Sequence, residues 1–170
     1  MKKVRLDQLV FDLGLTESRE RAKTTVMSGL VFVDGKRIDK PGTQVSPDSK
    51  IEVKGSAIPY VSRGGLKLEK ALKVFHIDPT GMHCIDCGAS TGGFTDVLLK
   101  NGAEKVFAVD VGYGQLAWSL RQDERVVNME RTNIRHISPE QIPEALDLAV
   151  ADLSFISLKL VLPAISSVLK

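Results

Sequence analysis

The sequence of 170 residues is poor in cysteine, which excludes the folds that depend on it. Cys84 and Cys87 are too few for a disulfide-stapled secreted fold or for the four ligands of a structural zinc ion. Their C-x-x-C spacing would suit a redox pair, but both lie in an apolar, strand-like run. We therefore expect the two thiols to be packed in a core, and we expect no metal site.

Long apolar runs are also missing. No stretch approaches the ~20 apolar residues of a membrane-spanning helix. The N-terminus is basic, but residues 6–15 are interrupted by Asp7, Asp12 and Gly14, so they do not resemble the apolar part of a signal peptide. These absences predict a cytoplasmic protein that does not enter a membrane.

Enough apolar residues remain for a packed core, since 43% of the chain is hydrophobic and 26% is charged. The net charge of +2 is unevenly spread. Residues 1–59 hold 11 Lys or Arg against 8 Asp or Glu, whereas residues 60–170 hold 12 against 13. The basic N-terminal part weakly indicates a polyanionic partner.

The N-terminal region predicts a small α+β domain over residues 1–54. Apolar residues from Leu6 to Leu13 recur at helical spacing, and Thr16 is the expected cap of a second helix that runs to about Met27. Short strands follow, with a hairpin turn at Asp34-Gly35. Residues 55–59, from Gly55 to Pro59, are expected to form a linker.

Residues 60–170 predict a doubly wound α/β domain with a parallel sheet. A helical stripe covers residues 68–75, and it is followed by alternating strand and helix patterns. The expected strands are residues 84–87, 106–109, 126–127 and 146–151, with helices starting at 94 and 157. Open α/β sheets usually have ~5–6 strands. Because the chain stops inside a helical pattern at Lys170, we expect the domain to be C-terminally truncated.

The run from Asp86 to Phe94 predicts a ligand-binding turn between the first strand and its helix. Its glycines allow a ligand close to the backbone, but Ser90 departs from the dinucleotide pattern G-x-G-x-x-G. Asp110 ends the next strand, where a carboxylate can bind two ribose hydroxyls. Asp152 ends a further strand and should lie on the same rim, although it could instead cap a helix.

Two sets of motifs resemble known families. Residues 5–7, 14–15, 18–22 and 29–35 are similar to the small RNA-binding domain first seen in ribosomal protein S-four. Residues 60–68, 86–96 and 151–157 resemble the TlyA (haemolysin A) family, which belongs with the FtsJ-like ribose 2′-O-methyltransferases of ribosomal RNA. The resemblance covers essentially the whole chain. It implies a Rossmann-like methyltransferase domain behind an RNA-binding domain.

This resemblance assigns a cofactor, S-adenosylmethionine, to the glycine turn, with Asp110 on its ribose. Asn133 follows the third strand and is expected at the adenine, with Glu130 as its rival. The expected cofactor-binding residues are Gly88, Ala89, Ser90, Thr91, Gly92, Gly93, Phe94, Asp110 and Asn133.

The resemblance also assigns catalytic residues. The family has a Lys-Asp-Lys-Glu tetrad, whose first Lys matches Lys67 and whose Asp matches Asp152. The second Lys and the Glu would lie beyond Lys170. A ribose hydroxyl must lose its proton to attack a methyl group, so a lysine could accept this proton while Asp152 orients the lysine or the methyl donor.

Ribosomal RNA or a ribosomal subunit is the expected partner, and no obligate protein partner is expected. The candidate RNA-binding residues are Arg5, Ser18, Arg19, Arg21, Lys23 and Arg63. Arg19 and Lys23 are four residues apart and share one helical face. Glu17 and Glu20 lie nearby, so an ordinary charged surface is the alternative.

Three other functions stay open. A non-catalytic RNA-binding protein would use the α/β part only as a scaffold, which the intact glycine turn and Asp110 argue against. A pore-forming haemolysin, suggested by the family's name, has no support from an amphipathic membrane hairpin or an export signal. A dinucleotide oxidoreductase is disfavoured by Ser90.

Overall fold

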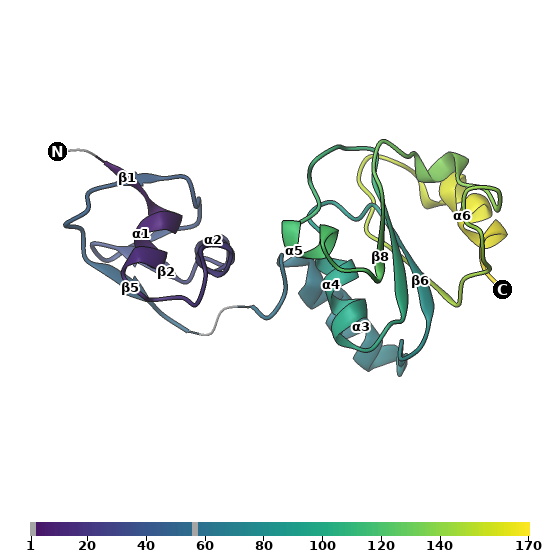
Figure 1. Cartoon of the computed structure of the whole chain (residues 1–170), viewed down its shortest axis with the longest axis horizontal. Helices are drawn as coiled ribbons and strands as arrows, with labels where there is room; N and C mark the ends of the chain where they lie inside the picture. The colour runs from purple at the N-terminus through teal and green to yellow at the C-terminus, as the bar shows by residue number, and fades with distance from the viewer. Residues whose placement is uncertain (1–2, 56–57) are drawn as a thin grey trace. The chain divides into compact units, whose positions relative to one another are not determined.

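The computed structural model describes residues 3–55 and 58–170. The chain divides into two units, Met1–Arg63 and Gly64–Lys170 (Figure 1). Residues 56 and 57, in the middle of the expected linker, lie outside the described residues. Each unit is described by itself below.

In residues 3–55 and 58–63, the first unit has two helices and two small antiparallel sheets. Its elements are β1 (Val4–Arg5), α1 (Leu6–Asp12), α2 (Arg19–Met27), β2 (Val31–Val33), β3 (Lys36–Ile38), β4 (Gln44–Val45) and β5 (Ile51–Val53). β1 pairs with β4, and β2 lies between β3 and β5. The helices pack on each other and bury Leu6, Val10, Ala22 and Val26 against Val31 of the sheet, which forms the core of the unit.

Two local predictions can be compared with this unit. The hairpin turn is at the predicted position, because Asp34 (φ 49°) and Gly35 (φ 79°) both have the positive φ that such a turn requires. The predicted cap of α2 is wrong. Ser18 caps the helix by accepting a hydrogen bond from the Arg21 amide at 3.1 Å, whereas the Thr16 hydroxyl donates to the Ser18 carbonyl. Ser18 therefore sets the start of the helix.

The second unit alternates helices and strands along the chain. Its elements are α3 (Gly64–Phe75), β6 (His83–Cys87), α4 (Gly93–Lys100), β7 (Lys105–Val109), α5 (Trp118–Arg121), β8 (Val126–Met129), the 3-10 helix η1 (Ile134–His136), β9 (Leu148–Ala151) and α6 (Leu158–Ser167). The strands pair in parallel in the order β8-β7-β6-β9. α3 and α4 lie on one face of the sheet and α6 on the other (Figure 1), so the predicted doubly wound fold is confirmed.

Strand β6 shows why the two cysteines do not form a pair. Successive side chains of a strand point to opposite faces, so Cys84 and Cys87, three residues apart, face opposite sides of the sheet. Cys87 packs in the core beneath α6 with Ile85, and both thiols are free and fully buried. Burial raises the pKa of each thiol to about 12, with smaller contributions from Asp147 at Cys84 and Asp86 at Cys87. The thiols are therefore inert packing groups, as predicted.

The end of the chain differs from its predicted helical pattern. Helix α6 ends at Ser167, and Leu169 then forms a parallel bridge with Leu146, just before β9. The predicted strand from 146 to 151 is accordingly shorter, since β9 covers only Leu148–Ala151. Within residues 3–55 and 58–170, no helix is both long and apolar enough to cross a membrane.

Candidate functional site

The turn between β6 and α4 depends on a glycine at its first position. Gly88 has φ +84°, and its amide, like that of Ala89, donates to the Val109 carbonyl, which fixes the turn against β7. A Cβ at Gly88 would lie 2.8 Å from Leu153 Cδ2 and 3.1 Å from the Asp152 carbonyl oxygen. Both the φ value and the close approach therefore require glycine here.

The same turn ends at a second obligatory glycine. Gly92 is the N-cap residue of α4 with φ +97°, and a Cβ there would collide with Leu116 and Leu120. Ser90 also has a positive φ of 51°. The turn is thus held open in front of the N-terminus of α4, where backbone N–H groups lack helical partners.

Asp110 joins this turn to the end of β7. Its Oδ2 accepts a hydrogen bond from the Ser90 amide at 2.8 Å, and its Oδ1 accepts one from the Gly112 amide at 2.7 Å. Two backbone donors therefore fix the carboxylate at the carboxyl edge of the sheet. Each carboxylate oxygen has a second lone pair, which leaves capacity for two hydroxyl donors.

A cavity of about 380 Å³ opens in front of this carboxylate. It is lined by Gly88, Ser90, Val109, Asp110, Val111, Thr132, Asn133, Ile134 and residues 152–156. This volume is in the range of small-molecule sites. Asn133 is therefore at the cavity, although its Oδ1 already accepts the Arg135 amide. Its rival Glu130 is not among the lining residues; it accepts the Gly114 amide and pairs with Arg121.

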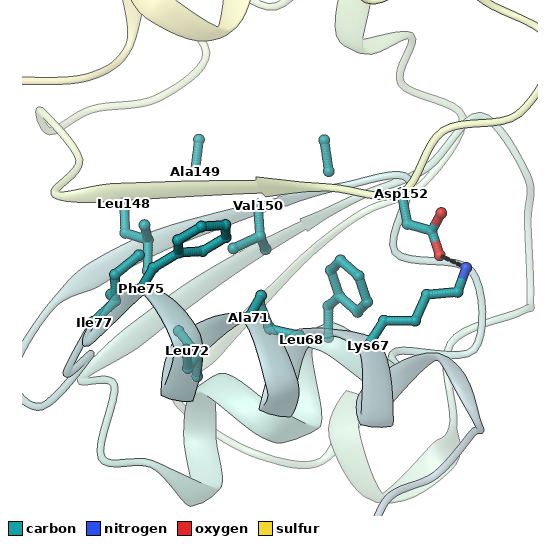
Figure 2. A pocket seen from close by; sticks show the side chains of 12 residues that line it. Lys67, Leu68, Ala71, Leu72, Phe75, Ile77, Leu148, Ala149, Val150 and Asp152 are labelled. Atoms are coloured by element: carbon teal, nitrogen blue, oxygen red, sulfur yellow. Dashed lines mark hydrogen bonds and ion pairs between the residues drawn. The ribbon is translucent and has the colours of Figure 1, made fainter.

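Lys67 and Asp152, far apart in sequence, meet at the same edge. Lys67 lies in the first turn of α3 and its Nζ is 2.6 Å from Asp152 Oδ2, just beyond the end of β9 (Figure 2). The Lys67 side chain is 66% exposed and that of Asp152 is 45% exposed, so a substrate can reach the pair. Asp152 also lines the 380 Å³ cavity, and its carbonyl approaches Gly88. The structure thus places the two candidate catalytic residues beside the glycine turn.

An apolar groove extends away from this ion pair, between α3 and β9. Figure 2 shows Leu68, Leu72 and Phe75 of α3 facing Leu148 and Val150 of β9, with Lys67 and Asp152 at one end. The groove has a volume of about 370 Å³. Its polar groups are therefore confined to the end nearest the glycine turn.

Asp86 is the first residue of the predicted ligand-binding run, but it was not among the expected cofactor-binding residues. It lies near the end of β6, only 1% of its surface is exposed, and its Oδ2 accepts hydrogen bonds from the Thr95 amide and hydroxyl. Its Oδ1 is buried and has no hydrogen-bond partner among the described residues. The sequence feature that could have pointed to Asp86 is the pattern D-x-G-x-S-x-G over residues 86–92, of which Asp86 is the first residue. The burial of its side chain cannot be read from that pattern.

Phe155 was also missed as a site residue. It has a positive φ of 61°, is fully exposed and lines the cavity. Its place at the cavity makes the ring available to a bound ligand. This exposure could not be predicted from the residue type, because phenylalanine is ordinarily buried.

In the first unit, the candidate RNA-binding side chains fall into two groups. Three of them are engaged within the unit: Arg5 forms two hydrogen bonds with Asp7, Ser18 caps α2, and Arg21 donates to the Ile58 carbonyl at 2.8 Å. The others, Arg19, Lys23 and Arg63, are exposed, and no hydrogen bond or ion pair holds them in the described part of the chain. The exposed group is the one available to an external anion.

Comparison with known proteins defines the class to which this fold and site belong. Residues 60–170 match the model of the FtsJ-like methyltransferase family, and residues 4–51 match the S4 domain. The chain therefore belongs to the FtsJ-like methyltransferases, with an S4 domain in front of the methyltransferase domain.

Individual proteins are similar to this chain over nearly its whole length. The chain is 53% identical over 99% of its length to the YqxC protein of Bacillus subtilis (strain 168), of which it covers 60%. It is 52% identical over 96% of its length to the 16S/23S rRNA (cytidine-2'-O)-methyltransferase TlyA of Mycobacterium tuberculosis (strain ATCC 25618 / H37Rv), of which it covers 62%. A solved structure of a Streptococcus thermophilus protein matches all of this chain and 63% of its own, with 51% identity and a TM-score of 0.70. The chain thus spans about three fifths of the length of these relatives.

Proposed function

We propose that this chain provides the RNA-binding and cofactor-binding parts of an enzyme that methylates a ribose 2′-hydroxyl of ribosomal RNA. The observation that carries the proposal is the ion pair of Lys67 and Asp152 beside the glycine turn. The name of the M. tuberculosis relative, an rRNA (cytidine-2'-O)-methyltransferase, supports the same reaction. An enzyme that methylates ribosomal RNA would act in the cytoplasm, which is the location we propose.

The residues at the site fit S-adenosylmethionine as the methyl donor. The Asp110 carboxylate would bind the ribose, Gly88 to Phe94 would hold the methionine part, and Asn133 would lie at the adenine. Bound there, the cofactor would supply an electrophilic methyl group on a positively charged sulfur. Asp86, Asp110 and Asp152 all lie at the carboxyl ends of strands at this edge, and the unpartnered Asp86 Oδ1 is a buried acceptor among the described residues there. An acidic edge of this kind suits a cation.

The same features argue against a dinucleotide. A pyrophosphate group would meet the carboxylates of this edge, and the Ser90 amide is already bound to Asp110. The dinucleotide pattern instead uses free backbone amides near the helix N-terminus to bind phosphate. We therefore propose a methyltransferase and not an oxidoreductase.

Lys67 and Asp152 would divide the remaining work between them. Asp152 holds the Lys67 ammonium at 2.6 Å, which fixes the side chain at the edge of the cavity. From there, Lys67 would give up its ammonium proton to solvent, orient the attacking hydroxyl, and accept the hydroxyl proton on the neutral amine as the oxygen–carbon bond forms. Holding a hydroxyl and a methyl group in line lowers a barrier by several kcal/mol, because the orientation no longer has to be found by chance.

The first unit would bring the substrate. Its fold matches the S4 domain, and Arg19, Lys23 and Arg63 are exposed cations on it. Phosphate contacts made by such side chains carry no sequence information, so they would set affinity and not the choice of nucleotide.

The position of the methyl group tests this proposal. Ribosomal subunits would be incubated with the enzyme and S-adenosylmethionine carrying a labelled methyl group, and the RNA then hydrolysed in alkali. A methylated 2′-oxygen cannot attack its phosphate, so we expect one bond to resist hydrolysis and the label to remain in that dinucleotide. Label on a base, with complete alkaline cleavage, would contradict the proposal.

A further inference from the structure

The buried carboxyl group of Asp86 is only half satisfied. Thr95 donates its amide (3.0 Å) and its hydroxyl (2.8 Å) to Oδ2, while Oδ1 is buried without a hydrogen-bond partner in the described part of the chain. An ionised carboxylate in such a place loses its hydration without full replacement, which is costly. The neutral, protonated form avoids most of this cost.

The charged groups around Asp86 also favour its neutral, protonated form. Asp110 follows β7 and Asp152 follows β9, the two strands that flank β6, and both carboxylates disfavour a further negative charge. The cation at this edge, Lys67 of α3, is bound to Asp152, and on α4 the neighbouring Asp96 pairs with Lys100. Burial is the largest effect, and together with these two carboxylates it outweighs the Thr95 hydrogen bonds and raises the pKa of Asp86 to about 7.

We propose that Asp86 is a proton-linked specificity residue, which is protonated in the cofactor-free chain and ionises when the cationic methyl donor binds. The proposal rests on the proposed function, since it takes S-adenosylmethionine as the ligand. The positive charge of the donor, bound at this acidic edge, would offset the repulsion between Asp86 and the carboxylates of Asp110 and Asp152 and would make the charged form of Asp86 favourable. The proton passes to the buffer, so binding of the donor releases up to one proton through this group.

The same group distinguishes the donor from the product. Methyl transfer leaves a neutral thioether in place of the sulfonium, and the attraction that kept Asp86 ionised is lost. Asp86 then takes up a proton again, which removes a charge that favours the donor. Ionised Asp86 therefore raises the affinity for S-adenosylmethionine more than that for S-adenosylhomocysteine.

Calorimetric titration of the 170-residue chain tests this inference without any measurement of activity. Titrations at pH 7 in phosphate and in Tris, whose ionisation enthalpies differ, give the number of protons released. We expect the affinity for S-adenosylmethionine to fall about tenfold from pH 8 to pH 6, because a group with a pKa near 7 must ionise on binding. The affinity for S-adenosylhomocysteine should change less. The α-amino group of each ligand also titrates, but it is the same for wild type and Asp86→Asn, so the difference between the two chains isolates the contribution of Asp86.

Three variants assign the proton to Asp86. Asp86→Asn keeps the shape of the side chain and should abolish the proton release and the pH-dependent preference for the donor. Thr95→Val removes one hydrogen bond that favours the ionised form, so the midpoint of the pH dependence should move upward while the carboxyl group remains. Asp96→Asn is the control. It alters a different buried carboxylate, on α4, and should leave the proton release and the pH-dependent preference for the donor unchanged.

Two outcomes separate this inference from the proposed function. One outcome is that wild type and Asp86→Asn both bind S-adenosylmethionine, with the same proton release and the same preference for the donor over the product. In that case Asp86 does not have the proposed role, although the proposed function stands. If the cofactor fails to bind at any pH, the proposed function is wrong and this inference with it. Should Asp86→Asn fail to fold, an unmoved midpoint in folded Thr95→Val would overturn the inference.

Discussion

The two units of the chain place their charged residues in opposite ways. In the first unit, cations such as Arg19 and Lys23 are exposed on α2, and the acid that is buried, Asp7, is neutralised by Arg5. In the second unit, Asp86, Asp110 and Asp152 gather at one edge of the sheet, with Lys67 as their nearby cation. A polyanion suits the first arrangement and a small cation the second. This contrast is the basis for proposing that the RNA and the methyl donor bind to different units.

The largest effect is expected from Lys67, the candidate acceptor of the hydroxyl proton. Lys67→Ala should lower the rate of methyl transfer by about 10²- to 10⁴-fold, because it removes the group that accepts the hydroxyl proton. Affinity for S-adenosylmethionine should stay nearly intact, since the loss falls on the transition state. Initial rates on ribosomal subunits, together with calorimetric binding, measure both quantities.

Lys70→Ala, on the same helix and exposed, is the matched control for Lys67→Ala and should keep the wild-type rate. A Lys67→Ala enzyme with wild-type turnover would remove Lys67 from the mechanism.

The next largest effect concerns the acidic edge alone. Asp110→Ala should weaken binding of S-adenosylmethionine by roughly 1.5–3 kcal/mol for each of the two charge-assisted hydrogen bonds that it removes from the ribose. Because Asp110 also holds the Ser90 and Gly112 amides, thermal unfolding must first show that the variant is folded. Calorimetry that gives an unchanged dissociation constant would show that the cofactor does not use this carboxylate.

A smaller, salt-dependent effect tests the first unit. The double variant Arg19→Ala/Lys23→Ala should lower the slope of log affinity against log salt by about two, because each of the two cations would neutralise one phosphate of the RNA. Lys50→Ala/Lys54→Ala is the control, because it also removes two positive charges from the first unit. Both of its ammonium groups lie beside Glu52, so they are less available to the RNA and the slope should change less. Equal slopes for wild type and Arg19→Ala/Lys23→Ala would place the RNA on another surface.

The smallest effect is a pH dependence of stability in the cofactor-free chain. The pKa of Asp86 is raised to about 7 by burial, above its unfolded value near 4. The folded chain therefore binds one more proton between about pH 4 and pH 7, and its stability falls as the pH rises through this range. Asp86→Asn lacks this loss, so its stability relative to the wild type should increase by on the order of 1–3 kcal/mol from pH 4 to pH 8. Parallel urea titrations at both pH values would contradict this if the difference between the two chains stayed constant.

The turn and the acidic residues at the edge of the sheet in the second unit could be predicted from the sequence, because glycines in a turn and acids at the end of a strand are recognisable from a few neighbouring residues. The turn at Gly88 and Gly92, and the acids Asp110 and Asp152 at the ends of strands, follow from patterns of a few residues. A parallel sheet must bring such strand ends to one edge. The pairing of Lys67 with Asp152 was reached only through a family resemblance, since no local pattern joins residues so far apart.

The remaining features depend on tertiary interactions that the sequence does not display. Arg21 is tied to the Ile58 carbonyl by a long-range hydrogen bond, and Arg5 turns toward the buried Asp7. Whether a charged residue is free for a ligand therefore depends on the tertiary fold. The same holds for Asp86, whose pKa is raised by burial and by the carboxylates of Asp110 and Asp152, which follow neighbouring strands.

Amide NMR spectra of the isotopically labelled chain, recorded during addition of S-adenosylmethionine, test most directly whether the acidic edge binds the methyl donor. We expect the largest shifts at Gly88, Ser90, Gly92 and Gly112, with further shifts near Asn133, because these amides line or support the cavity. Amides of α1 and α2 should not move. Saturating cofactor that leaves the glycine turn unshifted, or that shifts chiefly the first unit, would contradict the account.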